Sequence, residues 1–223
     1  AVAFSLTAAF GQSMPVVGFL NSASPSGYAQ MAAAFREGLK QTGFVPGESV
    51  QIEYRWANDS YDKLPELVQQ LVQRRVAVIF ANSPSIPHAK NATNSIPIVF
   101  TSGDDPVRLG FVASLNRPGG NLTGVAIMSN ELAAKRLSLL RDLVPNTRRV
   151  AVLINTDFGP SSRFRADVEN AAKALPVDVT FLRTSSDHEI EEAFALMTTE
   201  RPDALLIGPG PFLDSRRSLL ISL

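Results

Sequence analysis

The chain has 223 residues, of which 45% are hydrophobic and 19% charged, and this ordinary composition excludes a disordered or collagen-like protein. Lysine plus arginine number 21, as do aspartate plus glutamate, so no net field attracts phosphates, and nucleic acid is not expected as a partner. The absence of cysteine excludes disulfides, thiolate metal sites and a cysteine nucleophile. The length allows one or two folded domains.

The first ten residues are small and apolar, and Ala9-Phe10-Gly11 then precedes Gln12-Ser13. This pattern is typical of the hydrophobic region and cleavage site of a secretory signal. The run is too short for the ~20 apolar residues that cross a membrane, and a short buried strand or helix is the alternative. We therefore predict that residues 1–13 are the remnant of a signal peptide and that the protein is exported, either periplasmic or tethered to the membrane.

The next segment alternates short apolar strands with amphipathic helices. Strands are predicted at 16–20, 50–54, 76–80, 96–100 and 121–128, and helices at 28–42, 64–72 and 86–92. Apolar runs that alternate with helices are typical of a parallel sheet whose connections cross over in the right-handed sense. Residues 14–128 are thus expected to form a Rossmann-like α/β lobe with five strands.

The same pattern begins again after a helix at 132–143. The run Val17–Ser22 matches Ala151–Thr156, and Val50–Pro84 can be laid over Val177–Pro211 without a gap. Such self-similarity over a long period indicates a duplicated domain, although any two strand–helix–strand units look alike to some degree. Residues 129–223 are therefore predicted to form a second Rossmann-like lobe. A helix that starts at 215 has no stop signal, so we expect this lobe to be incomplete.

Ligands of open parallel sheets bind beyond the carboxyl ends of the strands, where loops and helix N-termini present polar groups. In this chain those positions hold short hydroxyl and amide side chains, which can bond a carboxylate, amine or hydroxyl, and aromatic rings that can cover an apolar group. The same residue types also cap turns and helices, which is the structural alternative for each. The predicted ligand-binding residues are Ser22, Tyr28, Asn82, Ser83, Ser102, Asp105, Met128, Asn155, Phe158, Ser161 and Gly208, with a hinge near Met128 and Ser129.

The sequence gives little evidence of a catalytic or metal site. No Gly-x-Ser-x-Gly, Walker or Gly-x-Gly-x-x-Gly sequence follows a predicted strand. His88 and His188 are interpreted as surface residues of helices, without a histidine or carboxylate four residues away that would suggest a metal site. Of the adjacent pair Asp104-Asp105, one is expected to cap the next helix, and Asp105 is assigned to the ligand. A hydrolase or transferase would need a nucleophile–base pair that is not found, so we predict no enzyme activity, no metal and no cofactor.

The segment Gly103–Val125, GDDPVRLGFVASLNRPGGNLTGV, closely resembles a signature of the ABC-transporter substrate-binding family that includes bacterial tryptophan and tyrosine uptake proteins. The resemblance extends over most of residues 15–217 through VVGFL, ANSP, IPIVF, RRVAVLINT and PDALLIGPGPF. It implies a type I periplasmic-binding-protein fold, in which a cleft between two lobes binds a small amino-acid-like or aromatic carboxylate solute. It also implies delivery of that solute to an ABC permease, by a protein expected to be monomeric.

Carried over by position, the resemblance assigns most of the strand-end residues given above to the lining of the cleft. The loop Thr156–Pro160 departs from the family pattern, which puts the identity of the solute in doubt. The main alternative function is a ligand-sensing domain of a receptor or regulator, because the same fold serves there and fold alone does not fix function. The export-like start and the lack of a helix-turn-helix before Val16 argue against a DNA-bound role.

Overall fold

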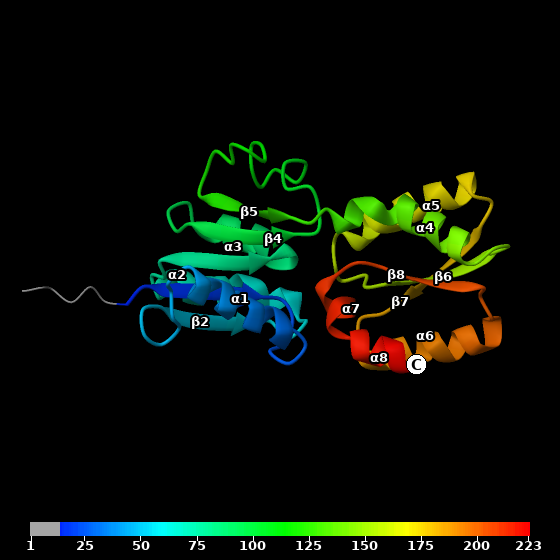
Figure 1. Ribbon diagram of the computed structural model, residues 1–223, viewed down its shortest axis with the longest axis horizontal. Helices are drawn as coiled ribbons and strands as arrows, with labels where there is room; N and C mark the ends of the chain where they lie inside the picture. Colours follow the sequence, from blue (N-terminus) through cyan, green and yellow to red (C-terminus); the bar gives the residue numbers. More distant parts are fainter. Residues whose placement is uncertain (1–13) are drawn as a thin grey trace, which may run out of the picture.

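The computed structural model describes residues 14–223, so the predicted signal segment at 1–13 lies outside the described residues. Two parallel sheets form the centres of two lobes that lie side by side along the longest axis of the molecule (Figure 1). The first sheet has five strands in the order β2-β1-β3-β4-β5, and the second has three in the order β7-β6-β8. The predicted α/β class with parallel sheets is therefore confirmed.

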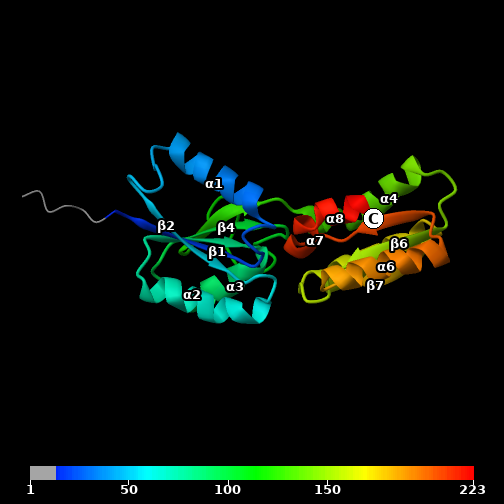
Figure 2. The same cartoon turned by 90° about the horizontal axis from the view of Figure 1, so that it is seen from below.

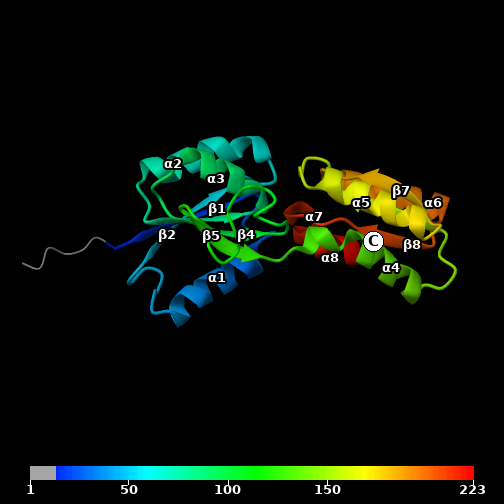
Figure 3. The ribbon, with the colours of Figure 1, turned by 90° about the horizontal axis from the view of Figure 1, so that it is seen from above.

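The first lobe follows the predicted order of elements closely. Its strands are β1 (Val16–Asn21), β2 (Gln51–Trp56), β3 (Val78–Asn82), β4 (Ile98–Ser102) and β5 (Leu122–Ala126), and its helices are α1 (Ala29–Gln41), α2 (Leu64–Gln73) and α3 (Ile86–Ala92), with short 3-10 turns η1 (Tyr61–Lys63) and η2 (Ser83–Ser85). Helix α1 covers one face of the sheet, and α2 and α3 cover the other (Figures 2 and 3).

The two faces of the first sheet have different cores. Beneath α2 and α3 the core is aliphatic, because α2 buries Leu64, Val68 and Leu71 on one helical face against the strands. Beneath α1 the core is aromatic: the ring of Phe19 is stacked on Phe80, with ring centroids 4.7 Å apart. Burial of these side chains on both faces explains why the central strands appear in the sequence as continuous apolar runs.

The second lobe begins with the turn η3 (Ser129–Leu132). Its remaining elements are α4 (Ala133–Leu143), β6 (Arg149–Ile154), α5 (Ser161–Ala174), β7 (Asp178–Arg183), α6 (Asp187–Glu200), β8 (Ala204–Ile207), α7 (Pro211–Ser215) and α8 (Arg217–Ser222). Helices α4 and α5 pack on one face of the sheet, and α6, α7 and α8 lie on the other (Figure 1). The helix predicted from residue 215 corresponds to α8, and the short helix α7 before it was not predicted.

The internal repeat is visible in the strand order, because β7-β6-β8 reproduces β2-β1-β3. Val17 is paired with Val78 in the first sheet, and Ala151 is paired with Leu205 in the second, which are the positions that the sequence overlay matches. The pairing with the other neighbouring strand differs by one residue. Val17 of β1 lies opposite Ile52 of β2, which the overlay matches with Val179, but Ala151 of β6 lies opposite Thr180 of β7. We retain the domain boundary between 128 and 129 as a proposal, supported by the packing of α4 on α5.

Within residues 14–223, no helix combines the length and the apolar composition that crossing a bilayer requires.

Candidate ligand-binding cleft

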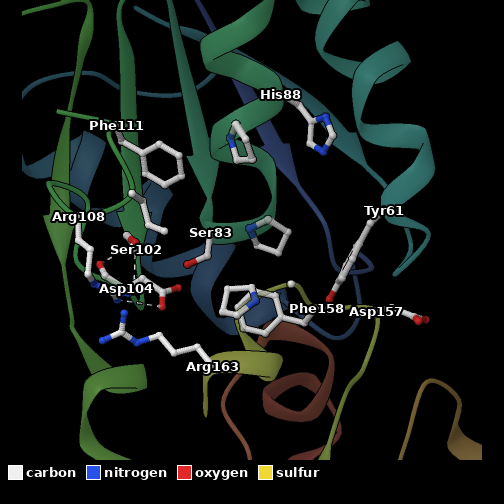
Figure 4. A pocket seen from close by; sticks show the side chains of 15 residues that line it. Tyr61, Ser83, His88, Ser102, Asp104, Arg108, Phe111, Asp157, Phe158 and Arg163 are labelled. Carbon is white, nitrogen blue, oxygen red and sulfur yellow. Dashed lines mark hydrogen bonds and ion pairs between the residues drawn. The ribbon is translucent and has the colours of Figure 1, made fainter. Parts of the chain in front are cut away.

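A cavity of about 520 Å³ lies between the two lobes, at the carboxyl ends of the strands. It lies within the range of about 300–1,000 Å³ that is usual for small-molecule sites. Its lining residues are Tyr61, Ser83, Pro84, Pro87, His88, Ser102, Asp104, Arg108, Leu109, Phe111, Asp157, Phe158, Gly159, Pro160 and Arg163. Figure 4 shows Asp104, Arg108 and Arg163 at one side of this cavity and Tyr61 and Asp157 at the other, with Phe158 between them.

A smaller cavity of about 100 Å³ adjoins the first one and shares Ser83, Ser102 and Phe158 with it. Its lining residues are Tyr28, Asn82, Ser83, Thr101, Ser102, Gly103, Ile127, Ser129, Asn130, Phe158, Gly210, Pro211 and Asp214. Both cavities thus draw residues from the two lobes. We call the two together the cleft.

The loops of the first lobe that face the cleft are held by a buried amide–hydroxyl network. The side chain of Asn82 donates from Nδ2 to Ser22 Oγ (2.8 Å), and its Oδ1 accepts from the Ser22 backbone N–H (3.1 Å) and from Ser85 Oγ (2.7 Å). These bonds join the ends of β1 and β3, which are neighbours in the sheet. Because buried polar groups are costly unless they are paired, the network fixes the geometry of both loops.

Two hydroxyl groups lie where the cavities meet. Ser83 Oγ accepts from the Gly103 N–H at 3.0 Å, and Ser102 Oγ donates to the backbone oxygen of Asp104 at 2.9 Å. From the second lobe, the Phe158 ring packs over Gly210, where a Cβ atom would lie 3.0 Å from the ring. Gly210 has φ +142°, a backbone conformation that side chains other than hydrogen rarely allow.

Charged groups from both lobes converge at one edge of the cleft. Glu131 of the turn η3 forms ion pairs with Arg108 of the first lobe and with Arg163 of α5, the latter at 3.1 Å. Asp104 Oδ2 accepts from Asn130 Nδ2 at 2.8 Å, and its Oδ1 lies 3.9 Å from Arg108 Nη2. Burial raises the pKa of the Asp104 carboxyl and Glu131 acts in the same direction, while Asn130 and Arg108 partly oppose the rise.

Other ionisable groups in the cleft also respond to the surrounding protein. Burial raises the pKa of the Tyr61 phenol, as do the Asp59 and Asp157 carboxylates, and the buried Tyr61 hydroxyl finds no hydrogen-bond partner among the described residues. Burial likewise raises the pKa of Tyr28, and desolvation by the surrounding protein raises the pKa of the Asp214 carboxyl. Tyrosines of this kind are neutral hydrogen-bonding groups at physiological pH.

Comparison with known proteins identifies the family. Residues 17–208 match the model of the family described as "ABC transporter substrate binding protein". The tyrosine-binding protein of Clostridioides difficile (strain R20291) is 30% identical over 164 residues, which are 72% of this chain and 46% of that protein. The chain belongs to the ABC transporter substrate-binding protein family.

Two solved structures share the fold of this family member. An ABC domain from Streptococcus pneumonia, solved in complex with L-Trp, superposes with a TM-score of 0.73 at 22% identity, over 92% of this chain and 72% of that chain. A conserved domain protein from Vibrio cholerae superposes with a TM-score of 0.74 at 20% identity, over 86% of this chain and 64% of that one. The chain thus spans less than half the length of its curated tyrosine-binding relative. The family is one of substrate-binding proteins and not of enzymes.

Five of the predicted ligand-binding residues line the cleft of this substrate-binding protein, and these are Tyr28, Asn82, Ser83, Ser102 and Phe158. They come from three loops of the first lobe and one loop of the second. Their convergence follows from the parallel strand order, which brings the carboxyl ends of β1, β3, β4 and β6 to the space between the lobes.

Four other predicted residues do not line either cavity, and their contact with a ligand stays a prediction. Ser22 is fully buried in the network with Asn82, and Asn155 Oδ1 accepts from the Asp157 N–H at 2.9 Å to form a turn. Ser161 is buried at the start of α5. Gly208 packs against β6, where a Cβ atom would lie 2.7 Å from the Leu153 oxygen.

Two further predicted residues, Asp105 and Met128, lie where the chain turns and do not line either cavity. Asp105 caps the following turn through the Val107 N–H (2.9 Å), and it is Asp104 that faces the cavity. Met128 does not line the cleft, although its neighbours Ile127 and Ser129 do. Its φ of +55° lets the chain turn from β5 into η3, which agrees with a turn between the lobes.

The two histidines do not both lie on free surfaces as predicted. His88 lines the larger cavity, and partial burial lowers its pKa, which favours the neutral imidazole. His188 lies 3.4 Å from Glu192, one helical turn later on α6, so its predicted lack of an acidic partner was wrong. Among residues 14–223, no group of histidine and acidic side chains has the arrangement of a metal site.

Sequence reasoning missed Tyr61, Arg108, Phe111, Arg163 and Asp214 as lining residues. The loop after β2 could have been included by the strand-end rule, and this would have found Tyr61. Arg108 and Phe111 lie within the family signature, but nothing in their spacing distinguishes them from solvated residues. Arg163 and Asp214 lie in the first turns of α5 and α7, where they reach the cleft only because the lobes meet there.

Proposed function

We propose that this protein is the solute-binding component of an ABC importer and that it binds a small amino-acid-like or aromatic carboxylate solute in the cleft. The observation that carries this proposal is the joint lining of the cleft by both lobes at the carboxyl ends of their strands. Apolar rings and prolines supply most of the wall, and a few hydroxyl and charged groups supply orientation. This combination is usual for reversible binding of a small organic molecule.

The relatives support the proposed class of solute. The Clostridioides difficile protein is named for tyrosine, and the pneumococcal domain was solved with L-Trp. Both molecules combine an aromatic body with a charged head. The larger cavity has room for a ring and offers charged groups at its edge, and the smaller one, which contains Tyr28 and Asp214, adjoins it.

A thermal-shift screen of amino acids and aromatic acids tests the proposal. A ligand that binds only the folded state stabilises it by about 2.7 kcal/mol at a hundredfold excess over Kd, which for a chain of this size raises the Tm by about 5–10 °C. We expect at least one aromatic amino acid or aromatic acid to give a saturable rise, with one site by calorimetry. If no compound of either class shifts the Tm or gives heat, the cleft is not a site for such solutes.

We further propose that the protein acts outside the cytoplasm, as a monomer, and delivers its solute to an ABC permease. Transport by the cognate permease in proteoliposomes should depend on this protein and on the solute that shifts its Tm. A ligand-dependent effect on transcription or signalling, without stimulated transport, would instead favour the sensory role that the same fold can serve.

A further inference from the structure

Asp104 is the one charged residue among residues 14–223 whose side chain is buried, with 3% of its surface exposed. It faces the larger cavity. The other acidic residues that line the cleft, Asp157 and Asp214, are exposed. A buried carboxylate is costly unless it is paired and hydrogen-bonded, so its position in the wall of a cavity requires an explanation.

Within residues 14–223, only one oxygen of this carboxylate accepts a hydrogen bond. Oδ2 accepts a hydrogen bond from Asn130 Nδ2, which is itself buried. Oδ1 accepts none from the described residues, and its closest cation, Arg108 Nη2, is 3.9 Å away, beyond hydrogen-bonding distance. Asn130 therefore orients the carboxylate and leaves one oxygen free on the cavity side.

The charge of Arg108 is directed elsewhere. Its guanidinium is paired closely with Glu131, and Glu131 also holds Arg163 from the second lobe. Arg108 is thus engaged by an exposed carboxylate and leaves the free oxygen of Asp104 without a strong partner. The cavity that Asp104 faces is lined by apolar groups, among them Leu109, Phe111 and Phe158, as well as by the two arginines, and in a largely apolar cavity a charged donor is bound more strongly than in water.

We propose that Asp104 selects the ligand: its Oδ1 atom binds an ammonium group, so that the cleft prefers a solute with a cationic nitrogen over the corresponding simple carboxylate. The proposal rests on the proposed function and narrows it to amino acids with an apolar or aromatic side chain. The ammonium lies against Asp104, and the side chain occupies the apolar part of the larger cavity. Asn130 acts as a positioning residue for the carboxylate.

The experiment compares pairs of ligands that differ only in the amino group. The pairs are L-tyrosine with 3-(4-hydroxyphenyl)propanoate, L-tryptophan with 3-(indol-3-yl)propanoate, and L-leucine with 4-methylpentanoate. Calorimetric Kd values are measured for the wild type, Asp104→Asn and Asp105→Asn. A hydrogen bond to a charged group corresponds to roughly a ten- to hundredfold preference, so we expect the wild type to prefer at least one amino acid over its partner by that ratio.

In Asp104→Asn the preference is expected to fall about tenfold or more, while the affinity for the acid without an amino group changes little. Asp105→Asn is the matched control, because it removes the same charge from the adjacent residue, which caps a turn outside the cavity and can do so equally well as asparagine. Its preference should equal that of the wild type.

The ligand-free melting temperature separates selection from a structural role. In Asp104→Asn the new amide oxygen can still accept from Asn130, and Arg108 keeps Glu131. Removal of a poorly paired buried charge should therefore leave the Tm of this variant equal to or above that of the wild type. A lower Tm, together with an equal loss of affinity for both ligands of a pair, would assign Asp104 a structural role and overturn the proposal.

Two further results are distinguishable. Equal binding of both members of every bound pair by the wild type, or an unchanged preference in Asp104→Asn, overturns the role of Asp104 and leaves solute binding intact. Binding of no compound from any pair or from the wider screen overturns the proposed function itself, and the selection by Asp104 with it.

Discussion

Short polar side chains at strand ends serve two purposes in this molecule, and the two can be separated residue by residue. Ser22 and Asn155 satisfy the chain's own amides and hydroxyls, which shapes the loops. Asp104 and Tyr61 keep polar atoms that the described residues do not satisfy. Asn21, Asp59 and Ser161 also have such atoms but line neither cavity, so an unsatisfied polar atom marks a candidate binding position only where its residue also lines the cleft.

Substitution of Gly210 tests how much the shape of the cleft depends on a single residue. Alanine there would have an unfavourable backbone conformation, and its Cβ would press on the Phe158 ring. We expect Gly210→Ala to destabilise the protein by about 1–3 kcal/mol and to weaken solute binding, because the ring that lines both cavities must move. Urea unfolding and calorimetry measure the two effects.

Gly38 provides the matched control. It lies inside α1, and a Cβ atom there would meet nothing within 4 Å. Gly38→Ala should stabilise the protein by about 0.5–1 kcal/mol without changing affinity, because alanine is the better helix former. Equal stability of the two variants would show that Gly210 is not required by conformation or packing.

At the level of secondary structure, the cleft depends on helices that begin beside it. Helix α7 presents Asp214, and its Phe212 and Leu213 pack with Ile190 of α6 in a small separate core. Helix α6 in turn begins with a cap: Ser186 Oγ accepts from the Glu189 N–H at 3.2 Å. Packing of α6 therefore supports the helix that completes the smaller cavity.

Removal of this cap should weaken the second lobe. Ser186→Ala deletes the acceptor for the Glu189 N–H at the start of α6, and loss of such a cap costs about 1 kcal/mol, or about 2–4 °C in Tm. Ser138→Ala within α4 is the control, because serine inside a helix is a weaker helix former than alanine, and its replacement should not lower the Tm. If the Ser186 cap does not contribute to stability, both variants will have a Tm at or above that of the wild type.

At the level of the whole molecule, the two lobes are also joined by a second set of charges. Arg216, between α7 and α8, forms an ion pair with Asp59 of the first lobe and another, at 2.9 Å, with Asp187 of its own lobe. The lobes also touch closely at Gly27, where a Cβ atom would lie 2.8 Å from Ser215. These contacts join the lobes in the arrangement of Figure 1.

We predict that Arg216→Gln separates the lobes. Loss of the ion pair with the largely buried Asp59 should favour a more open ligand-free molecule, seen as a larger radius of gyration by X-ray scattering. The apparent Kd for the solute should rise about tenfold, because less of the protein is in the binding-competent arrangement.

The control for the loss of charge is Arg165→Gln. Arg165 pairs with Glu169 on the surface of α5, within one lobe, so its loss changes the net charge equally and breaks no contact between lobes. The radius of gyration and Kd of this variant should match those of the wild type. An unchanged radius in Arg216→Gln would mean that the other contacts determine the arrangement of the lobes.

The helices and strands and their approximate bounds could be predicted from the sequence alone. Apolar runs and helical spacing are local properties, so the strand at 16–20 and the helix at 86–92 were predicted almost to the residue. The strand-end rule predicted the position of the cleft, because parallel strands bring their carboxyl ends to one edge of the sheet whatever their side chains. The long signature at Gly103–Val125 predicted the family.

The tertiary structure alone decided which side chains meet in the cleft. Which of the neighbours Asp104 and Asp105 faces the cavity depends on Asn130. This residue is distant in sequence and holds Asp104 toward the cavity through its hydrogen bond. Arg163 and Asp214 reach the cleft only because the second lobe packs against the first. The direction of a side chain in a turn is set by such long-range contacts, and a periodicity within one segment carries no information about them.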